Sequence, residues 1–172
     1  MKPIITFLTI TIACSIFVFG QTKPSTADTR FMKSAAEGGM AEVKLGQLAQ
    51  EKASNQSVKD FGKRMVNDHT KANDQLKDLA LKKGVDLPTS ISAKDQATYD
   101  RLSKLSGSEF DREYMRDMVK DHQMDVSEFR RETQMAKDAD TKAFAQQTLP
   151  TLDDHLNQAK QIDSQIGTTS RK

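Results

Sequence analysis

The chain has 172 residues, of which 36% are hydrophobic and 29% charged, and its 26 basic side chains are balanced by 24 acidic ones. This balance leaves no surplus of positive charge for a nucleic acid or for polybasic docking on a membrane, so neither is expected as a partner. A chain of this length forms one domain with a sizeable core. Because the sequence has no Trp, two Tyr and eight Met, that core must be filled by Leu, Ala, Phe and Met, which favours helices.

Residues 1–20 have the pattern of a secretory signal peptide: Lys2, an uncharged apolar run, and Gly20 as the small residue at the cleavage position. A signal anchor is one alternative, but the run is shorter than the roughly 20 residues that a membrane helix needs. A lipoprotein signal with Cys14 as the modified residue is another, although Thr11 stands where such signals carry Leu. We therefore expect an exported protein, periplasmic, secreted or peripherally associated with the outer membrane, with no membrane span after cleavage. Cys14 is the only cysteine, so cleavage removes any thiolate ligand or disulfide.

The rest of the chain is predicted to comprise a polar tether over residues 21–27, one helical domain over residues 28–167 and a tail over residues 168–172. Apolar residues recur at the spacing of an amphipathic helix in four long segments, each bounded by polar or glycine-bearing stretches. These segments are residues 31–53, 57–84, 109–136 and 140–166. Four long amphipathic helices predict an all-α four-helix bundle.

A long connection, residues 85–108, joins the second of these segments to the third. It contains one short predicted helix over residues 93–105, because Ser92 and Asp95 form a capping pair at its start. The sequence leaves two topologies open: an up-down-up-down bundle, or a bundle with a long crossover through this connection.

An internal repeat relates the two halves of the domain. Shifting the sequence by 83 positions aligns Phe31 with Tyr114, and Glu42 with Asp125. The fourth segment carries about three extra residues before its histidine. This self-similarity predicts two related helical hairpins.

Polar side chains occupy the middle of each apolar face. The chain has three histidines, His69, His122 and His155, and at about 100° per residue each of them points with the apolar residues of its helix. The first helix has no histidine, but Glu42 lies at the centre of its apolar stripe, and Asp125 lies at the edge of the face that carries His122. Because the three histidines and Glu42 lie near the midpoints of their helices, they are expected to meet at one level.

Burying these groups without partners is costly, and a transition metal would compensate for the cost. Imidazole and carboxylate ligands suit zinc, copper, iron or manganese. The sequence therefore predicts a site in which Asp68 and Asp154 orient the imidazole rings and the ligands are Glu42, His69, His122, Asp125 and His155. The alternative is a metal-free network in which an ionised Glu42 faces a protonated histidine and only fixes the register of the helices.

Two methionines precede histidines by one helical turn. Met65 stands before His69 and Met118 before His122, a spacing that suits copper(I). Filling a leucine-poor core is the commoner role of such methionines, and it is the interpretation favoured here.

Several short motifs together resemble a bacterial family of exported helical proteins, the domain of unknown function DUF4142. They are Phe31-Met32, Gly38-Gly39-Met40-Ala41-Glu42-Val43, Leu45-Gly46, Asp68-His69, Leu87-Pro88, Ser106-Gly107, Asp121-His122 and Leu149-Pro150. The resemblance covers residues 31–162 and implies a ferritin-like four-helix bundle, with no settled activity. Ferritin-type di-iron sites use paired Glu-x-x-His motifs, which this chain lacks, so a nitrogen-rich site is the better expectation.

The function expected from these features is that of an exported helical bundle that binds a transition metal and serves in metal handling or envelope stress. The alternative is a metal-free structural or protein-interaction module of the cell envelope. An enzyme is less well supported, because no nucleophile or acid–base pair stands out apart from the candidate ligands.

Overall fold

The structure is a computed structural model that describes residues 23–169. The predicted signal peptide over residues 1–20, with its Cys14, lies outside the described residues, as do residues 170–172. The described part is built from α1 (Thr26–Lys52), α2 (Gln56–Lys83), α3 (Ala93–Ser103), α4 (Gly107–Met135) and α5 (Ala139–Thr169).

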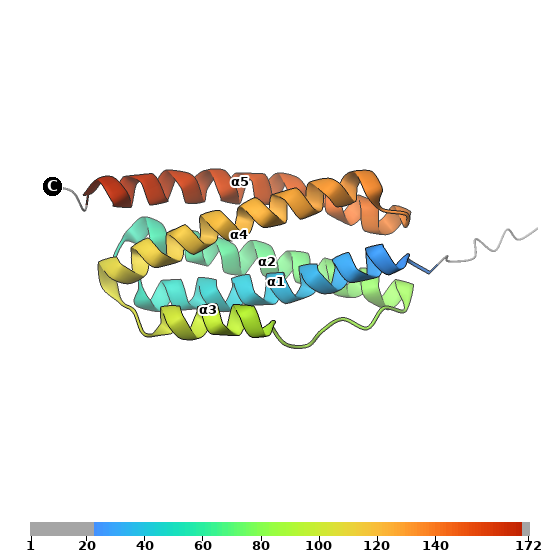
Figure 1. Cartoon of the computed structure of the whole chain (residues 1–172), viewed down its shortest axis with the longest axis horizontal. Coiled ribbons are helices and arrows are strands. Elements are labelled where there is room, and N and C mark those ends of the chain that lie inside the picture. The colour runs from blue at the N-terminus through green and yellow to red at the C-terminus, as the bar shows by residue number, and fades with distance from the viewer. Residues whose placement is uncertain (1–22, 170–172) are drawn as a thin grey trace, which may run out of the picture.

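The four long helices form two hairpins that pack on each other (Figure 1). α1 pairs with α2, α4 pairs with α5, and the short helix α3 lies on the connection between the hairpins. This connection crosses the length of the bundle, so α2 and α4 run in the same direction (Figure 1). The predicted ferritin-like bundle of two hairpins, with a short helix in a long connection, is confirmed.

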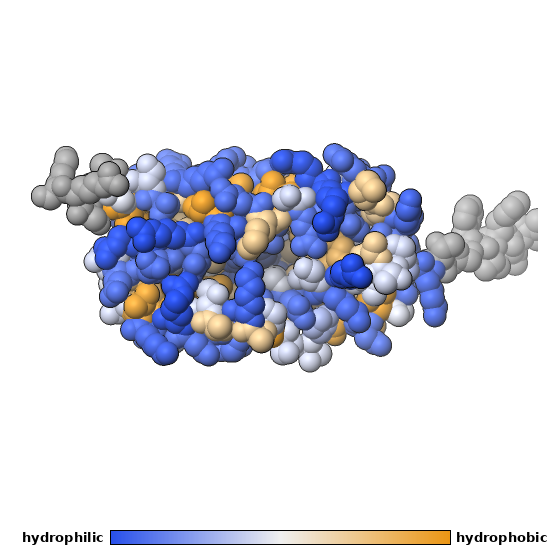
Figure 2. Space-filling view, viewed as in Figure 1, coloured by the Kyte–Doolittle hydropathy of each residue, from blue (hydrophilic) through white to orange (hydrophobic). Residues whose placement is uncertain are grey.

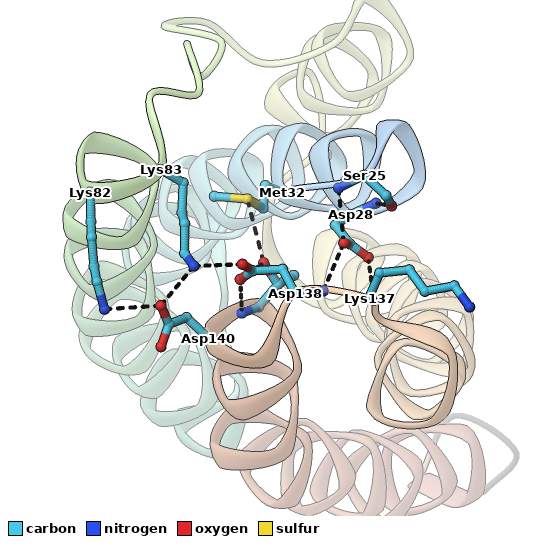
Figure 3. A network of polar contacts seen from close by, with 9 residues as sticks. Ser25, Asp28, Met32, Lys82, Lys83, Lys137, Asp138 and Asp140 are labelled. Atoms are coloured by element: carbon cyan, nitrogen blue, oxygen red, sulfur yellow. Dashed lines mark hydrogen bonds and ion pairs between the residues drawn. The ribbon is translucent and has the colours of Figure 1, made fainter. Parts of the chain in front are cut away.

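The two hairpins cap each other at opposite ends of the bundle. Asp28, at the start of α1, accepts hydrogen bonds from the N–H groups of Lys137 and Asp138 in the α4–α5 loop, at 3.1 and 3.0 Å (Figure 3). Asp111, near the start of α4, accepts hydrogen bonds from the N–H groups of Ser54 and Asn55 in the α1–α2 loop, both at 3.0 Å. Asp28 and Asp111 are 83 positions apart, and so are the loop residues that they bind. The repeat seen in the sequence is therefore a structural repeat.

An ion-pair network joins the end of α2 to the α4–α5 loop. The Nζ of Lys83 lies 2.5 Å from a carboxylate oxygen of Asp138 and 2.8 Å from one of Asp140 (Figure 3). Asp138 also accepts the N–H of Thr141 at 2.8 Å and thereby caps the first turn of α5. Burial alone would raise the pKa of Asp138, but these donors hold that pKa below its usual value.

The first helix starts two residues before residue 28, where the sequence predicts the start of the domain. α1 begins at Thr26, inside the predicted tether over residues 21–27, because Ser25 and Asp28 form a capping box in which each side chain accepts the backbone N–H of the other residue. At the other end of the domain, α5 extends to Thr169 and so includes the first residues of the predicted tail, 168–172.

Helix caps inside the domain match the sequence in one case and differ in another. Ser92 caps α3 as predicted, and its hydroxyl accepts the N–H of Asp95 at 3.1 Å. α2 begins at Gln56 because the cap is Asn55, whose side chain accepts the N–H of Ser57 at 2.8 Å. Asn is among the most favourable N-cap residues, so α2 starts one residue before the predicted segment 57–84.

The apolar core is divided into two clusters along the bundle. One cluster surrounds Phe61 and Tyr114 at the α1–α2 loop end, and the other surrounds Phe31 and Phe144 at the opposite end. Each long helix carries a buried polar residue at or within a residue of the boundary between the two clusters: Glu42, His69, His122 and His155. The expected shared level of these groups is therefore present as a polar layer across the middle of the core.

The outer faces of the helices are polar. On the face shown in Figure 2 most residues are hydrophilic, and hydrophobic residues are scattered between them. Within residues 23–169, none of the helices contains a stretch apolar enough and long enough to cross a bilayer.

Removing either of the reciprocal caps should destabilise the bundle by a similar amount. We expect Asp111→Ala and Asp28→Ala each to lower the free energy of unfolding by about 2–4 kcal/mol, because each leaves the loop N–H groups without their charged acceptor. Urea unfolding followed by circular dichroism measures the change. Asp78→Ala, at an exposed position on α2, is the control and should change stability by less than about 0.5 kcal/mol. A loss as small as that of the control would show that the caps do not hold the hairpins together.

Stability should fall with rising pH through Glu132. This buried residue has its pKa raised from 4.5 to about 7, first by burial and then by the negative charge of Asp28. Between these two values the folded protein holds the proton and the unfolded chain releases it, so the contribution of Glu132 to stability declines from pH 4.5 to about 7 and stays low above. We expect Glu132→Gln to stabilise the protein by about 1–2 kcal/mol at pH 8 and by much less at pH 4.5. Urea unfolding at both values measures this, and an effect independent of pH would contradict it.

Candidate metal centre

The three histidines meet in the polar layer, one each from α2, α4 and α5. The ring centroids of His69 and His155 lie 5.4 Å apart, those of His122 and His155 also 5.4 Å, and those of His69 and His122 5.8 Å. One nitrogen of each ring lies within 4.8 Å of the other two. The ring of Phe61 packs against those of His122 and His155 and closes this cluster on the side of the first apolar cluster. We call the three histidines the histidine triad.

Hydrogen bonds at the outer nitrogens orient two of the rings. The Nδ1 of His122 lies 3.0 Å from the carbonyl oxygen of Met118, and the Nε2 of His155 lies 2.8 Å from a carboxylate oxygen of Asp68. Each of these oxygens accepts, so each of these ring nitrogens carries the proton and the opposite nitrogen keeps a lone pair. The opposite nitrogens, Nε2 of His122 and Nδ1 of His155, are buried without a hydrogen-bond partner, as is the Nε2 of His69.

Burial keeps the triad neutral. It lowers the pKa of His122 to about 4 and that of His69 well below 6.5, and the other imidazoles add to the effect. The pKa of His155 is also lowered by burial, although its hydrogen bond to Asp68 opposes the change. At pH 7 all three rings are therefore in the form that coordinates a metal.

Asp68 is the residue that holds His155 in place. Burial alone would raise the pKa of this carboxyl, but hydrogen bonds from His155 and Arg64 hold that pKa below its usual value. Arg64 donates to Asp68 at 3.2 Å and to Gln158 on α5 at 2.9 Å, so the arrangement bridges α2 and α5. The sequence predicted an orienting role for both Asp68 and Asp154. Asp68 contacts the ring of His155. The side chain of Asp154 is 71% exposed, and its carboxylate lies 3.9 Å from the guanidinium of Arg64.

Glu42 lies beside the triad, against the outer edge of His122. Its Oε1 is 3.9 Å from the Nδ1 of His122, which is the nitrogen that faces Met118 and not the nitrogen without a partner. Both carboxyl oxygens of Glu42 are buried without a hydrogen-bond partner. Burial, and next the negative charge of Asp121, raise the pKa of Glu42 well above 4.5. The ionised glutamate and protonated histidine of the metal-free alternative are therefore not the forms that this environment favours.

Asp125 lies on the other side of the layer, where it lines a small cavity together with His69. Burial raises its pKa well above 3.8, and the charges of Asp121 and Glu128 contribute. The fold thus brings the three histidines together as expected, while metal ligation by these histidines, Glu42 and Asp125 stays a prediction.

Four further residues lie near the triad; the sequence indicated a role for two of them and gave none for the other two. Met65 and Met118 are buried in the first apolar cluster, in keeping with the favoured core role. Arg64 was missed because its contact with Asp68 depends on side-chain conformation, although the four-residue spacing of the two was a visible signal. The hydroxyl of Tyr114, buried without a partner, was also not singled out.

Fold and site together define a class of protein: a helical bundle of two related hairpins whose core holds three neutral, converging imidazoles. The profile of the DUF4142 family, described as a domain of unknown function, matches residues 18–162. The chain therefore belongs to the DUF4142 family, as the motifs indicated. Among curated proteins no sequence match is found.

Solved structures with the same fold include two proteins of another family and a copper-bound protein. A DUF305 fragment from Deinococcus radiodurans has a TM-score of 0.74 at 14% identity, covering 84% of this chain and 99% of its own. A DUF305 protein from Streptomyces coelicolor, provisionally described as secreted, has a TM-score of 0.69 at 12% identity, covering 82% and 94%. CopM in its copper(I)-bound form has a TM-score of 0.65 at 18% identity, covering 78% and 93%. At these identities the likeness shows the shared fold.

Replacing Glu42 by an apolar residue should stabilise the metal-free protein. We expect Glu42→Leu to raise the free energy of unfolding at pH 7 by about 1–3 kcal/mol, because it removes two buried oxygens that have no partner and keeps a similar volume. Urea unfolding in the presence of a chelator measures the change. Glu51→Leu, at an exposed position on the same helix, is the matched control and should change stability by less than about 0.5 kcal/mol. A destabilised Glu42→Leu would mean that the carboxyl makes a favourable interaction within the layer.

Proposed function

We propose that the protein is an exported copper-binding protein of the cell envelope, in which the histidine triad holds one copper ion. The observation that carries this proposal is the set of three buried, neutral imidazole nitrogens that face one another without a hydrogen-bond partner. Leaving such groups buried and unpaired costs about 1–3 kcal/mol each. A bound ion turns this cost into binding energy.

The donor chemistry and the structural likeness both favour copper among the four metals considered. Imidazole suits zinc, copper and iron, and copper(II) forms the most stable complexes of the divalent series. Solved structures of CopM, which share this fold, were obtained with copper(I), copper(II) and silver. A separation of up to 4.8 Å between the nitrogens is wider than ligation at about 2.0–2.1 Å requires, so modest side-chain rotation accompanies binding.

Glu42 and Asp125 supplement the triad in this proposal. Glu42 is buried beside His122, and the half-buried Asp125 lines the same cavity as His69. The pKa of each carboxyl is raised. A cation in the layer would favour their ionised forms, so both carboxyls would supply negative charge to the ion, as ligands or as neighbours.

Metal handling, rather than catalysis, is the role that this site suits. The triad lies between two apolar clusters, and no nucleophile or separate acid–base pair accompanies it among the described residues. Export is supported by the pattern of residues 1–20 and by the provisional description of the DUF305 protein from Streptomyces coelicolor.

Copper loading tests the proposal. We expect the purified protein, loaded with copper and freed of excess metal, to hold one copper per chain and to melt at a higher temperature than the metal-free protein. His122→Ala should weaken binding by more than about 100-fold, because loss of a direct ligand exceeds the 10–100-fold effect of a ligand's hydrogen-bond partner. Elemental analysis and competition with a chelator of known affinity provide the measurements.

A matched pair of aspartate variants serves as the control for this experiment. Asp68→Asn should weaken copper binding by about 10–100-fold, because Asp68 holds the Nε2 proton of His155. Asp154→Asn removes the same charge from an exposed neighbour of His155 and should leave the affinity within about threefold. Less than about 0.1 copper per chain in the wild-type protein, or equal effects of the two aspartate variants, would overturn the proposed site.

A further inference from the structure

The structural repeat assigns a partner position to each residue of the polar layer. An offset of 83 pairs Glu42 with Asp125, and it pairs His122 with Gly39. With the three extra residues of α5, His155 pairs with His69. The layer therefore has two positions for each kind of donor, and one of the positions, Gly39, has no side chain.

A small cavity lies beside Gly39. Its volume is about 30 Å³, room for a water molecule or two, and Gly39 and His69 are both part of its wall. His69 is also the triad member that reaches furthest toward the outside, at 6% exposed against 0% for His122 and His155. The cavity thus adjoins the triad at His69, while His122 and His155 are not part of its wall.

The rest of the cavity wall combines polar groups from α1, α2 and α4 with apolar side chains, among them Leu76, Phe129 and Phe144. Asn73 and Asp125 line it, and the hydroxyl of Ser34 donates a hydrogen bond to Glu128 at 3.4 Å beside it. A Cβ atom at Gly39 would collide with the side-chain amide oxygen of Asn73. The Asn73 side chain therefore occupies the place next to Gly39 that a side chain at position 39 would enter.

We propose that this cavity is the open side of the histidine triad: a small exogenous ligand, water or a small anion, binds there and completes the coordination of an ion held by the triad. The inference rests on the proposed function, since it concerns an ion bound at the same histidines. Three protein ligands with a fourth position open to solvent form a site that exchanges its outer ligand, whereas four protein ligands form a closed site. Because Gly39 stands at the position that the repeat pairs with His122, the site lacks a fourth imidazole, and its outer ligand can exchange.

Azide titration of the copper(II)-loaded protein tests the inference. Azide would replace the outer ligand, without any change of oxidation state, and produce a charge-transfer absorption band and an altered electron paramagnetic resonance spectrum. We expect a saturable change with one azide per copper, while copper stays bound. Copper at one per chain with no spectral response to azide would overturn the open position and leave the proposed function standing. Failure of the protein to bind copper would overturn both.

Filling the position from α1 provides the second measurement. In the double variant Gly39→His with Asn73→Ala, the new imidazole occupies the place that the repeat assigns to it, and the asparagine that would collide with it is removed. We expect azide affinity to fall by at least tenfold and the resonance spectrum to show one more nitrogen ligand. Asn73→Ala alone is the comparison variant: it removes a group from the cavity wall without adding a ligand, so only the double variant should show the additional nitrogen ligand. Equal azide affinity in the double variant and the wild-type protein would contradict an open position beside Gly39. If the double variant does not fold, the titration of the wild-type protein still tests whether the copper site has an open position.

Discussion

The constraint on which the rest of this structure depends is a layer of polar groups across the middle of an apolar core. Three imidazoles and a carboxyl are buried between two apolar clusters. Burial prevents these groups from charging, and outer hydrogen bonds turn the lone pairs of His122 and His155 toward the centre. An arrangement that keeps nitrogen lone pairs converging and unpartnered stabilises the apo fold poorly and suits a positive ion well.

The register of the four long helices brings this layer to one level, and the reciprocal caps set that register. Asp28 fixes the α4–α5 loop against the start of α1, and Asp111 fixes the α1–α2 loop against the start of α4. With both ends tied, midpoints of helices of similar length coincide. A slip of one turn, 5.4 Å, would exceed the present separation of the triad nitrogens.

Helical periodicity predicted the bundle and, together with the helix midpoints, the convergence of His69, His122 and His155, because the apolar face of a helix is set by spacing alone. The two hairpins were predicted from the repeat at 83 positions. The start of α1 was missed because a capping box can lie inside a segment whose composition is that of a loop, as Ser25 and Asp28 show. The position of Glu42 at the outer edge of His122, and the contact of Arg64 with Asp68, depend on side-chain rotamers. Periodicity gives the direction of a Cβ atom and not the place of a carboxyl three bonds further on.

The joining of two hairpins in one chain has a consequence for how many donors the layer can offer. A pair of identical hairpins assembled about a twofold axis presents every side chain twice, so its donors come in even numbers. In a single chain the sequences of the two hairpins can diverge, while the reciprocal caps of Asp28 and Asp111 keep the two hairpins in the same relative position. Histidine in one half and glycine at the matching place in the other then give an odd count of three imidazoles, which no symmetric homodimer of such hairpins could provide.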